Sequence, residues 1–129
     1  MAASAFGVFL LKLRENRGLS LRELAQLAAV DHAYIYRLET GAKESPSDEV
    51  LGKLIRALKA TKRDADMLRY LAKNPNVSVG LAEYVLEDPT VTLDELATAA
   101  GVVYRGPTRR DYKTVIERVR RILGDKDGG

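Results

Sequence analysis

Apolar residues recur along almost the whole chain at the three- and four-residue spacing of amphipathic helices, and no stretch shows the sustained alternation of a strand. Four segments also place a hydroxyl three residues before a carboxylate: Ser20–Glu23, Thr61–Asp64, Thr92–Glu95 and Thr108–Asp111. In a capping box the hydroxyl accepts a hydrogen bond from a free backbone N–H at a helix start, and the acid reaches back. We therefore expect an all-α fold, with helices over about 4–16, 21–28, 32–40, 48–59, 62–73, 79–87, 93–100 and 109–123.

Breaks between these helices suggest two parts. The sequence Asn74-Pro75-Asn76 is the strongest interruption, because proline restricts the residue before it and cannot continue a helix. We expect a five-helix domain over residues 1–74 and a small three-helix domain over 77–123. The glycine-rich end, 124–129, is predicted to be a disordered tail.

The composition excludes most catalytic chemistry. The 129 residues include no cysteine, which excludes thiolate nucleophiles. They include only one histidine, which argues against a histidine-based metal site or a catalytic triad. We expect a non-enzymatic protein with no cofactor and no bound metal. The apolar start, 5–11, has no basic residue before it and ends at Lys12, which is typical of neither a signal peptide nor a membrane span. We expect a cytoplasmic, nucleoid-associated protein that does not enter membranes.

The segment from Ser20 to Gly41, SLRELAQLAAVDHAYIYRLETG, has the pattern of two short helices joined by a tight turn. Ala25 offers a small side chain where two steeply crossed helices would touch. Ile35 and Leu38 recur at i and i+3 on the second helix and provide its apolar anchors. This is the sequence form of a helix-turn-helix, whose second helix enters the DNA major groove.

The segment 6–72 resembles the Cro- and Xre-type helix-turn-helix family of phage repressors and bacterial regulators. The resemblance includes the leading LRENRGLS, the Leu-Glu-Thr-Gly end of the second helix and the following SPSDEVLGKLIRALKA. It implies a structural ion pair between Arg14 and Glu39. The chain departs from the family at Ala29, where the turn usually has glycine, and at Leu21, where many relatives carry a phosphate-binding glutamine.

Geometry and resemblance agree on the residues that face DNA bases. With Ile35 and Leu38 turned inward, the opposite face of the second helix presents Ala33, Tyr36 and Arg37, and His32 stands at its leading end. An arginine can donate two hydrogen bonds to guanine O6 and N7, and an alanine methyl can contact the methyl group of thymine. We expect these four residues to be the base-contacting set.

Contacts with the DNA backbone are expected at the rim of this helix. Ser20 lies at a helix start, where free backbone N–H groups attract anions. Arg22, Tyr34 and Lys43 flank the expected groove. Such contacts position a protein on DNA without selecting sequence, and they make affinity dependent on salt.

Charge is unevenly distributed although the total is only +3. Residues 1–75 carry 13 basic and nine acidic side chains, residues 76–103 carry five acidic and no basic ones, and residues 104–123 carry seven basic and two acidic ones. This segregation indicates surfaces suited to different partners.

The second half admits three interpretations. Thr92–Val102 repeats several apolar residues of Ser20–Val30 in register, and a basic amphipathic helix follows, so this half could be a second helix-turn-helix. In that case its DNA contacts would come from Arg109, Arg110, Lys113, Arg120 and Arg121. Alternatively the apolar stripe of the last helix dimerises the protein, or the repeat reflects generic helix chemistry.

We expect a sequence-specific regulator of transcription that binds double-stranded DNA, most simply a repressor acting as a homodimer. A single small helix-turn-helix offers limited discrimination, and a dimer doubles the bases that are read. An alternative is an antitoxin-type protein that binds a toxin partner and represses its own operon, with the acidic region 83–95 facing the toxin.

Overall fold

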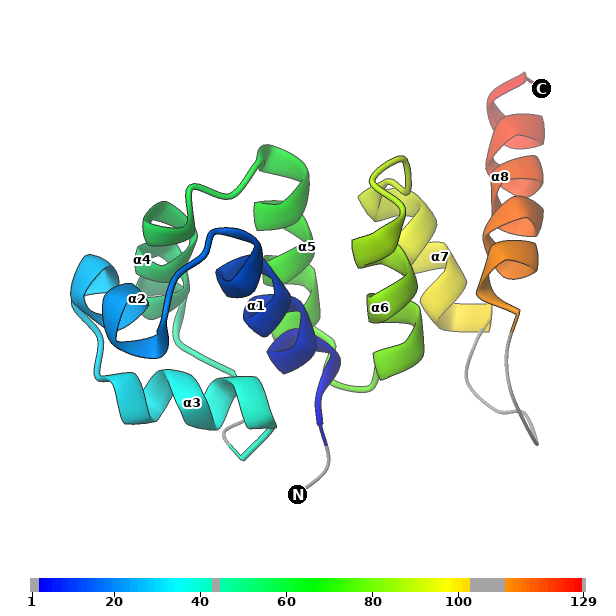
Figure 1. Ribbon diagram of the computed structural model, residues 1–129. Coiled ribbons are helices and arrows are strands. Elements are labelled where there is room, and N and C mark those ends of the chain that lie inside the picture. The colour runs from blue at the N-terminus through cyan, green and yellow to red at the C-terminus, as the bar shows by residue number, and fades with distance from the viewer. Residues whose placement is uncertain (1–2, 43–44, 103–110, 129) are drawn as a thin grey trace.

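The computed structural model describes residues 3–42, 45–102 and 111–128, with side chains described up to residue 124. These residues form eight α-helices and no strand, as the periodicity predicts (Figure 1). The helices are α1 (Ala5–Asn16), α2 (Leu21–Ala28), α3 (His32–Thr40), α4 (Asp48–Leu58), α5 (Lys62–Lys73), α6 (Val79–Glu87), α7 (Leu93–Val102) and α8 (Tyr112–Gly128).

The predicted helix starts are explained by their caps. Ser20 and Glu23 exchange hydrogen bonds at the start of α2, and Thr92 and Glu95 do the same at the start of α7. At α5 the hydroxyl of Thr61 accepts from the Asp64 N–H at 3.1 Å, but the Asp64 carboxylate pairs with Arg63 instead of reaching back. Two of these three are therefore complete capping boxes, both with glutamate, whose longer side chain can reach the cap.

Helix α8 differs from the prediction at both ends. Its cap is Asp111, whose carboxylate accepts from the Thr114 N–H at 3.2 Å, so the helix begins after Asp111 and not at residue 109. Thr108, the expected cap, lies outside the described residues. At the other end the backbone stays helical to Gly128, so most of the expected disordered tail is helix. Gly124 lies within the helix and does not adopt the left-handed conformation with which glycine commonly ends helices.

The two expected domains share one hydrophobic core. Buried side chains from α1 to α8 form a single cluster that continues across residue 74. Helix α1 has its most extensive contacts with α6, and α5 contacts α7, so the second half is packed onto the first. Figure 1 shows the resulting row, with α2, α3 and α4 at one end, α1 and α5 next to α6, and α8 at the other end.

Arg63 strengthens the connection between the halves. From the first turn of α5, its Nε donates to the Val91 carbonyl at 3.0 Å, and its Nη2 donates to the carbonyls of Val85 and Asp88, each at 2.9 Å. These carbonyls lie at the end of α6 and in the loop that follows, beyond the regular helical hydrogen bonds, and the Asp88 carbonyl also accepts from the Val91 N–H at 3.1 Å. One guanidinium thereby holds the α6–α7 connection against α5.

Candidate nucleic-acid interface

Helix α3 is held by its apolar face. Ile35 and Leu38 are fully buried, and the cap Asp31 accepts a hydrogen bond from the Tyr34 N–H at 3.1 Å. The helix ends at Gly41, whose φ of 84° is left-handed and is readily adopted by glycine. Because one face of α3 is buried along its length, the opposite face points outward.

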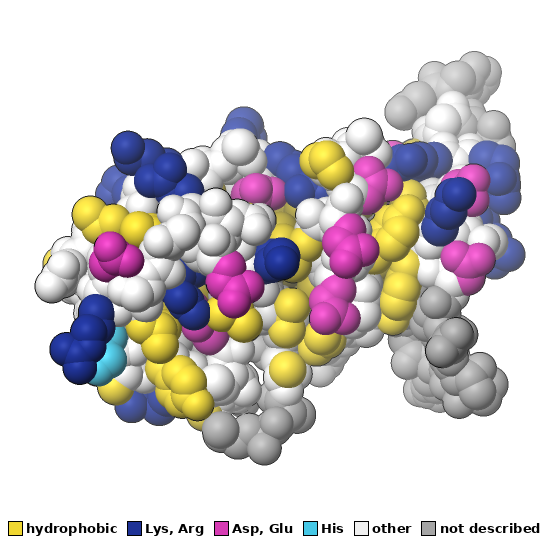
Figure 2. All heavy atoms as spheres, in the orientation of Figure 1, with side chains coloured by type: hydrophobic (Ala, Val, Ile, Leu, Met, Phe, Trp, Pro, Cys, Tyr) yellow, Lys and Arg dark blue, Asp and Glu magenta, His cyan; other side chains and the backbone are white. Residues whose placement is uncertain are grey.

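The outward face of α3 carries the residues predicted to contact bases. His32, Tyr36 and Arg37 are exposed, and Tyr36 keeps 52% of its surface accessible. Ala33 is partly exposed, one helical turn before Tyr36 and Arg37. Figure 2 shows the histidine on the surface at the start of α3, beside a basic side chain. These four residues therefore lie along one accessible helix surface.

The ion pair implied by the resemblance is present and fixes α3 against α1. Arg14 Nε donates to Glu39 Oε2 at 2.7 Å, and Arg14 Nη2 donates to Glu39 Oε1 at 3.0 Å. The third donor, Nη1, binds the Leu19 carbonyl at 2.8 Å, just before α2 begins. The hydrogen bonds with Glu39 raise the pKa of the Arg14 guanidinium above its ordinary value, so the Arg14 side chain stays positively charged. Arg14 thus joins α1, the start of α2 and the end of α3.

Gly7 is a positioning residue that the sequence analysis missed. A Cβ on Gly7 would lie 2.5 Å from the Leu38 carbonyl oxygen and 2.6 Å from that of Glu39. These oxygens belong to backbone that cannot move without displacing α3, so only glycine allows α1 to approach this closely. A glycine inside an otherwise apolar helix is the signal that could have identified it.

The residues predicted to contact the DNA backbone have different surroundings. Arg22 is exposed on α2, next to the helix start. The Ser20 hydroxyl is already used as a cap and accepts from the Glu23 N–H at 3.0 Å, which leaves its own proton for an outside acceptor. Tyr34 is half-buried and packs against the core, so only part of its ring faces outward. Lys43 lies outside the described residues.

The turn between α2 and α3 tolerates the departure at Ala29. This residue adopts φ 56° and ψ 46°, the left-handed conformation that the family usually gives to glycine. The conformation costs a non-glycine residue about 1 kcal/mol or somewhat more. The backbone of the turn is supported by the Val30 N–H, which donates to the Ala25 carbonyl at 3.0 Å.

The residues of the predicted second DNA-contacting set have different surroundings in the structure. Arg120 Nε donates to Glu95 Oε2 at 3.1 Å and its Nη2 donates to the Thr90 hydroxyl at 3.0 Å, so this guanidinium is engaged within the protein. Lys113 and Arg121 are exposed on α8. Arg109 and Arg110 lie outside the described residues. Part of the apolar stripe of α8 is also engaged, because Ile116 and Val119 are buried in the common core, whereas Ile122 keeps 51% of its surface exposed.

Comparison with known families agrees with the geometry of the first half. Residues 5–68, from the start of α1 into α5, match the family model of a helix-turn-helix domain. This part of the chain is therefore similar to helix-turn-helix domains, a class of domain that binds DNA. Among curated proteins, none matches the chain.

No helix among the described residues has both the length and the apolar character needed to cross a membrane.

Proposed function

We propose that the protein is a sequence-specific transcriptional regulator of the Cro and Xre type, acting as a repressor that binds its operator as a homodimer. The observation that carries this proposal is the outward face of α3, where Arg37, Tyr36 and His32 are exposed while Ile35 and Leu38 hold the helix from below. A helix presented in this way fits the major groove of B-form DNA.

Each residue of this surface has a distinct role in the proposal. Arg37 donates two hydrogen bonds to a guanine, and His32 forms one hydrogen bond near the start of the helix. Ala33 contacts a thymine methyl group, and Tyr36 contacts sugar or phosphate at the edge. The Arg14–Glu39 pair and Gly7 hold α3 so that these side chains reach the DNA together.

The backbone contacts proposed for Ser20, Arg22, Tyr34 and Lys43 supply affinity without sequence preference. Binding should therefore weaken as salt increases, in proportion to the number of phosphates that are neutralised.

Selection of bound fragments from the genome of the source organism, followed by footprinting, tests this proposal. We expect a site with two inverted half-sites whose centres are separated by about 34 Å, one turn of DNA, or a multiple of it. Equal recovery of all sequences would contradict sequence-specific binding. A single unrepeated half-site would contradict the dimer.

A further inference from the structure

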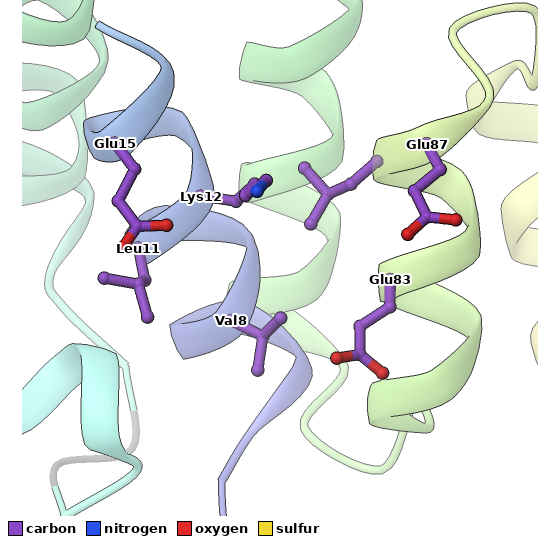
Figure 3. Close-up of a pocket in the computed structure, with 7 residues that line it drawn as sticks. Val8, Leu11, Lys12, Glu15, Glu83 and Glu87 are labelled. Carbon is purple, nitrogen blue, oxygen red and sulfur yellow. The ribbon is translucent and has the colours of Figure 1, made fainter. Parts of the chain in front are cut away.

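A groove with acidic edges lies between α1 and α6. It encloses about 230 Å³, and its lining includes the apolar side chains of Val8, Leu11 and Leu86 (Figure 3). Glu15 stands at one edge on α1, while Glu83 and Glu87 stand at the other on α6. Lys12 is the single basic residue of the lining. We call this feature the acidic groove.

The carboxylates of the acidic groove are free to bind an outside cation. Glu15, Glu83 and Glu87 are exposed, and none of them forms an ion pair with another described residue. An apolar floor with unpaired charges at its edges suits a partner whose exposed apolar side chain is surrounded by basic residues.

The same molecule carries a surface of that kind at the end of α2. Leu27 keeps 61% of its surface exposed, which makes it the most accessible of the large apolar side chains among the described residues. It lines a shallow hollow of about 500 Å³ together with four basic residues, Arg17, Lys53, Arg56 and Lys59. None of these four forms an ion pair with another described residue. We call this surface the Leu27 patch.

The two surfaces each include a residue from the C-terminal end of α1 or the position just after it. Glu15 belongs to the acidic groove, and Arg17, which follows the helix, belongs to the Leu27 patch. Figure 2 shows Lys and Arg side chains gathered over the α2 and α4 end, and Asp and Glu side chains along α6. Two surfaces of opposite charge on one molecule can pair reciprocally when two copies meet about a two-fold axis.

We propose that the protein self-associates by placing the Leu27 patch of one copy in the acidic groove of a second copy. The apolar contact between Leu27 and the groove floor supplies affinity, and the opposite charges select the orientation. The inference rests on the proposed homodimer and identifies its interface. It leaves the outward face of α3 uncovered, since no α3 residue lines either surface.

A charge-exchange experiment tests this interface in the full-length protein without DNA. Sedimentation velocity would compare the wild type with Glu83→Lys/Glu87→Lys and with Lys53→Glu/Arg56→Glu. We expect each double variant alone to raise the dimer dissociation constant at least tenfold, and an equimolar mixture of the two to restore association. In the mixture, each altered patch meets an altered groove of opposite charge. The matched control Glu117→Lys changes an exposed acid on α8 and should leave the dissociation constant unchanged.

Leu27→Ala provides an independent measurement, because an exposed side chain can be shortened with little effect on folding. We expect it to raise the dissociation constant about tenfold, with circular dichroism unchanged. A monomeric wild type at 100 µM, unchanged association of the charge variants, or no restoration in the mixture would overturn the interface. These outcomes are distinct from failure of the proposed function, because binding of one half-site through Arg37 is measured separately and needs no second copy.

Discussion

Arg14 and Glu39 form a two-bonded ion pair between α1 and the last turn of α3, with donor–acceptor distances of 2.7 and 3.0 Å. The Glu39 side chain retains only 4% of its accessible surface and that of Arg14 retains 13%. A carboxylate buried this deeply requires its partner, since removing one member of a buried pair leaves an uncompensated charge. The pair therefore couples the position of α3 to the stability of the domain.

The effects of replacing Arg14 and Glu39 on the free energy of unfolding should be strongly non-additive. We expect Arg14→Leu to lower the free energy of unfolding by about 3 kcal/mol, because it strands the more buried Glu39 charge. Glu39→Leu should cost less, since Arg14 is closer to solvent and keeps its bond to the Leu19 carbonyl. The double variant should be more stable than Arg14→Leu alone. Urea denaturation of the four proteins measures this cycle, and strictly additive losses would contradict the coupling.

Gly7→Ala should disturb the seating of α3. The added methyl would meet the Leu38 and Glu39 carbonyls at 2.5 and 2.6 Å, and overpacking of this kind costs about 1–3 kcal/mol. Gly101→Ala is the matched control, because nothing lies within 4 Å of a Cβ at that helical position. Thermal unfolding should show a lower midpoint for the first variant only. A Gly7→Ala protein as stable as the Gly101→Ala protein would show that α1 and α3 can separate without cost.

Ala29→Gly should stabilise the protein. Ala29 has a φ of 56°, and glycine adopts this left-handed conformation without the steric cost borne by alanine. Part of the gain is offset by the greater freedom of glycine in the unfolded chain, so we expect a net gain of about 0.5–1 kcal/mol. Ala57→Gly, inside α4, should have the opposite sign because its backbone is helical. Chemical denaturation would measure the free energy of unfolding of both variants. A lower value for Ala29→Gly than for the wild type would contradict the inference that Ala29 is strained.

Acid should weaken the start of α2. The hydrogen bond from the Ser20 backbone N–H, with a smaller effect of the Ser20 side chain, lowers the pKa of Glu23 below its ordinary value of 4.5. A carboxylate whose pKa is lowered in the folded state stabilises the fold when the pH is above its ordinary pKa. This stabilisation is lost as the pH falls through the folded-state pKa. The wild type should therefore exceed Glu23→Gln in stability at pH 6, and the difference should shrink below about pH 4.5. A difference that stays constant down to pH 3 would contradict this role of Glu23.

The sequence was sufficient to predict the helices and the first-half motif because their determinants are local. Caps such as Ser20 and the apolar spacing of Ile35 and Leu38 act within one or two helical turns. The ion pair of Arg14 with Glu39 was accessible only through family resemblance, because 25 residues separate its members.

Features that depend on packing between distant helices were not predictable in this way. Arg63 donates hydrogen bonds to the backbone carbonyls of Val85, Asp88 and Val91. Every residue type has such a carbonyl, so the sequence does not indicate which ones Arg63 binds. The shared core of the two halves likewise follows from the contact of α6 with α1, although a proline at residue 75 suggested separate domains. The pairing of Arg120 with Glu95 similarly depends on how α8 rests on α7.

The most direct measurement concerns Arg37, whose exposed position on α3 is the basis of the proposed base readout. Dissociation constants of the wild type and Arg37→Ala would be measured on the selected operator and on unrelated DNA at one salt concentration. We expect Arg37→Ala to lose about 1–3 kcal/mol per half-site on the operator and to bind unrelated DNA almost as well as the wild type. An equal loss on both DNAs would contradict sequence readout by α3.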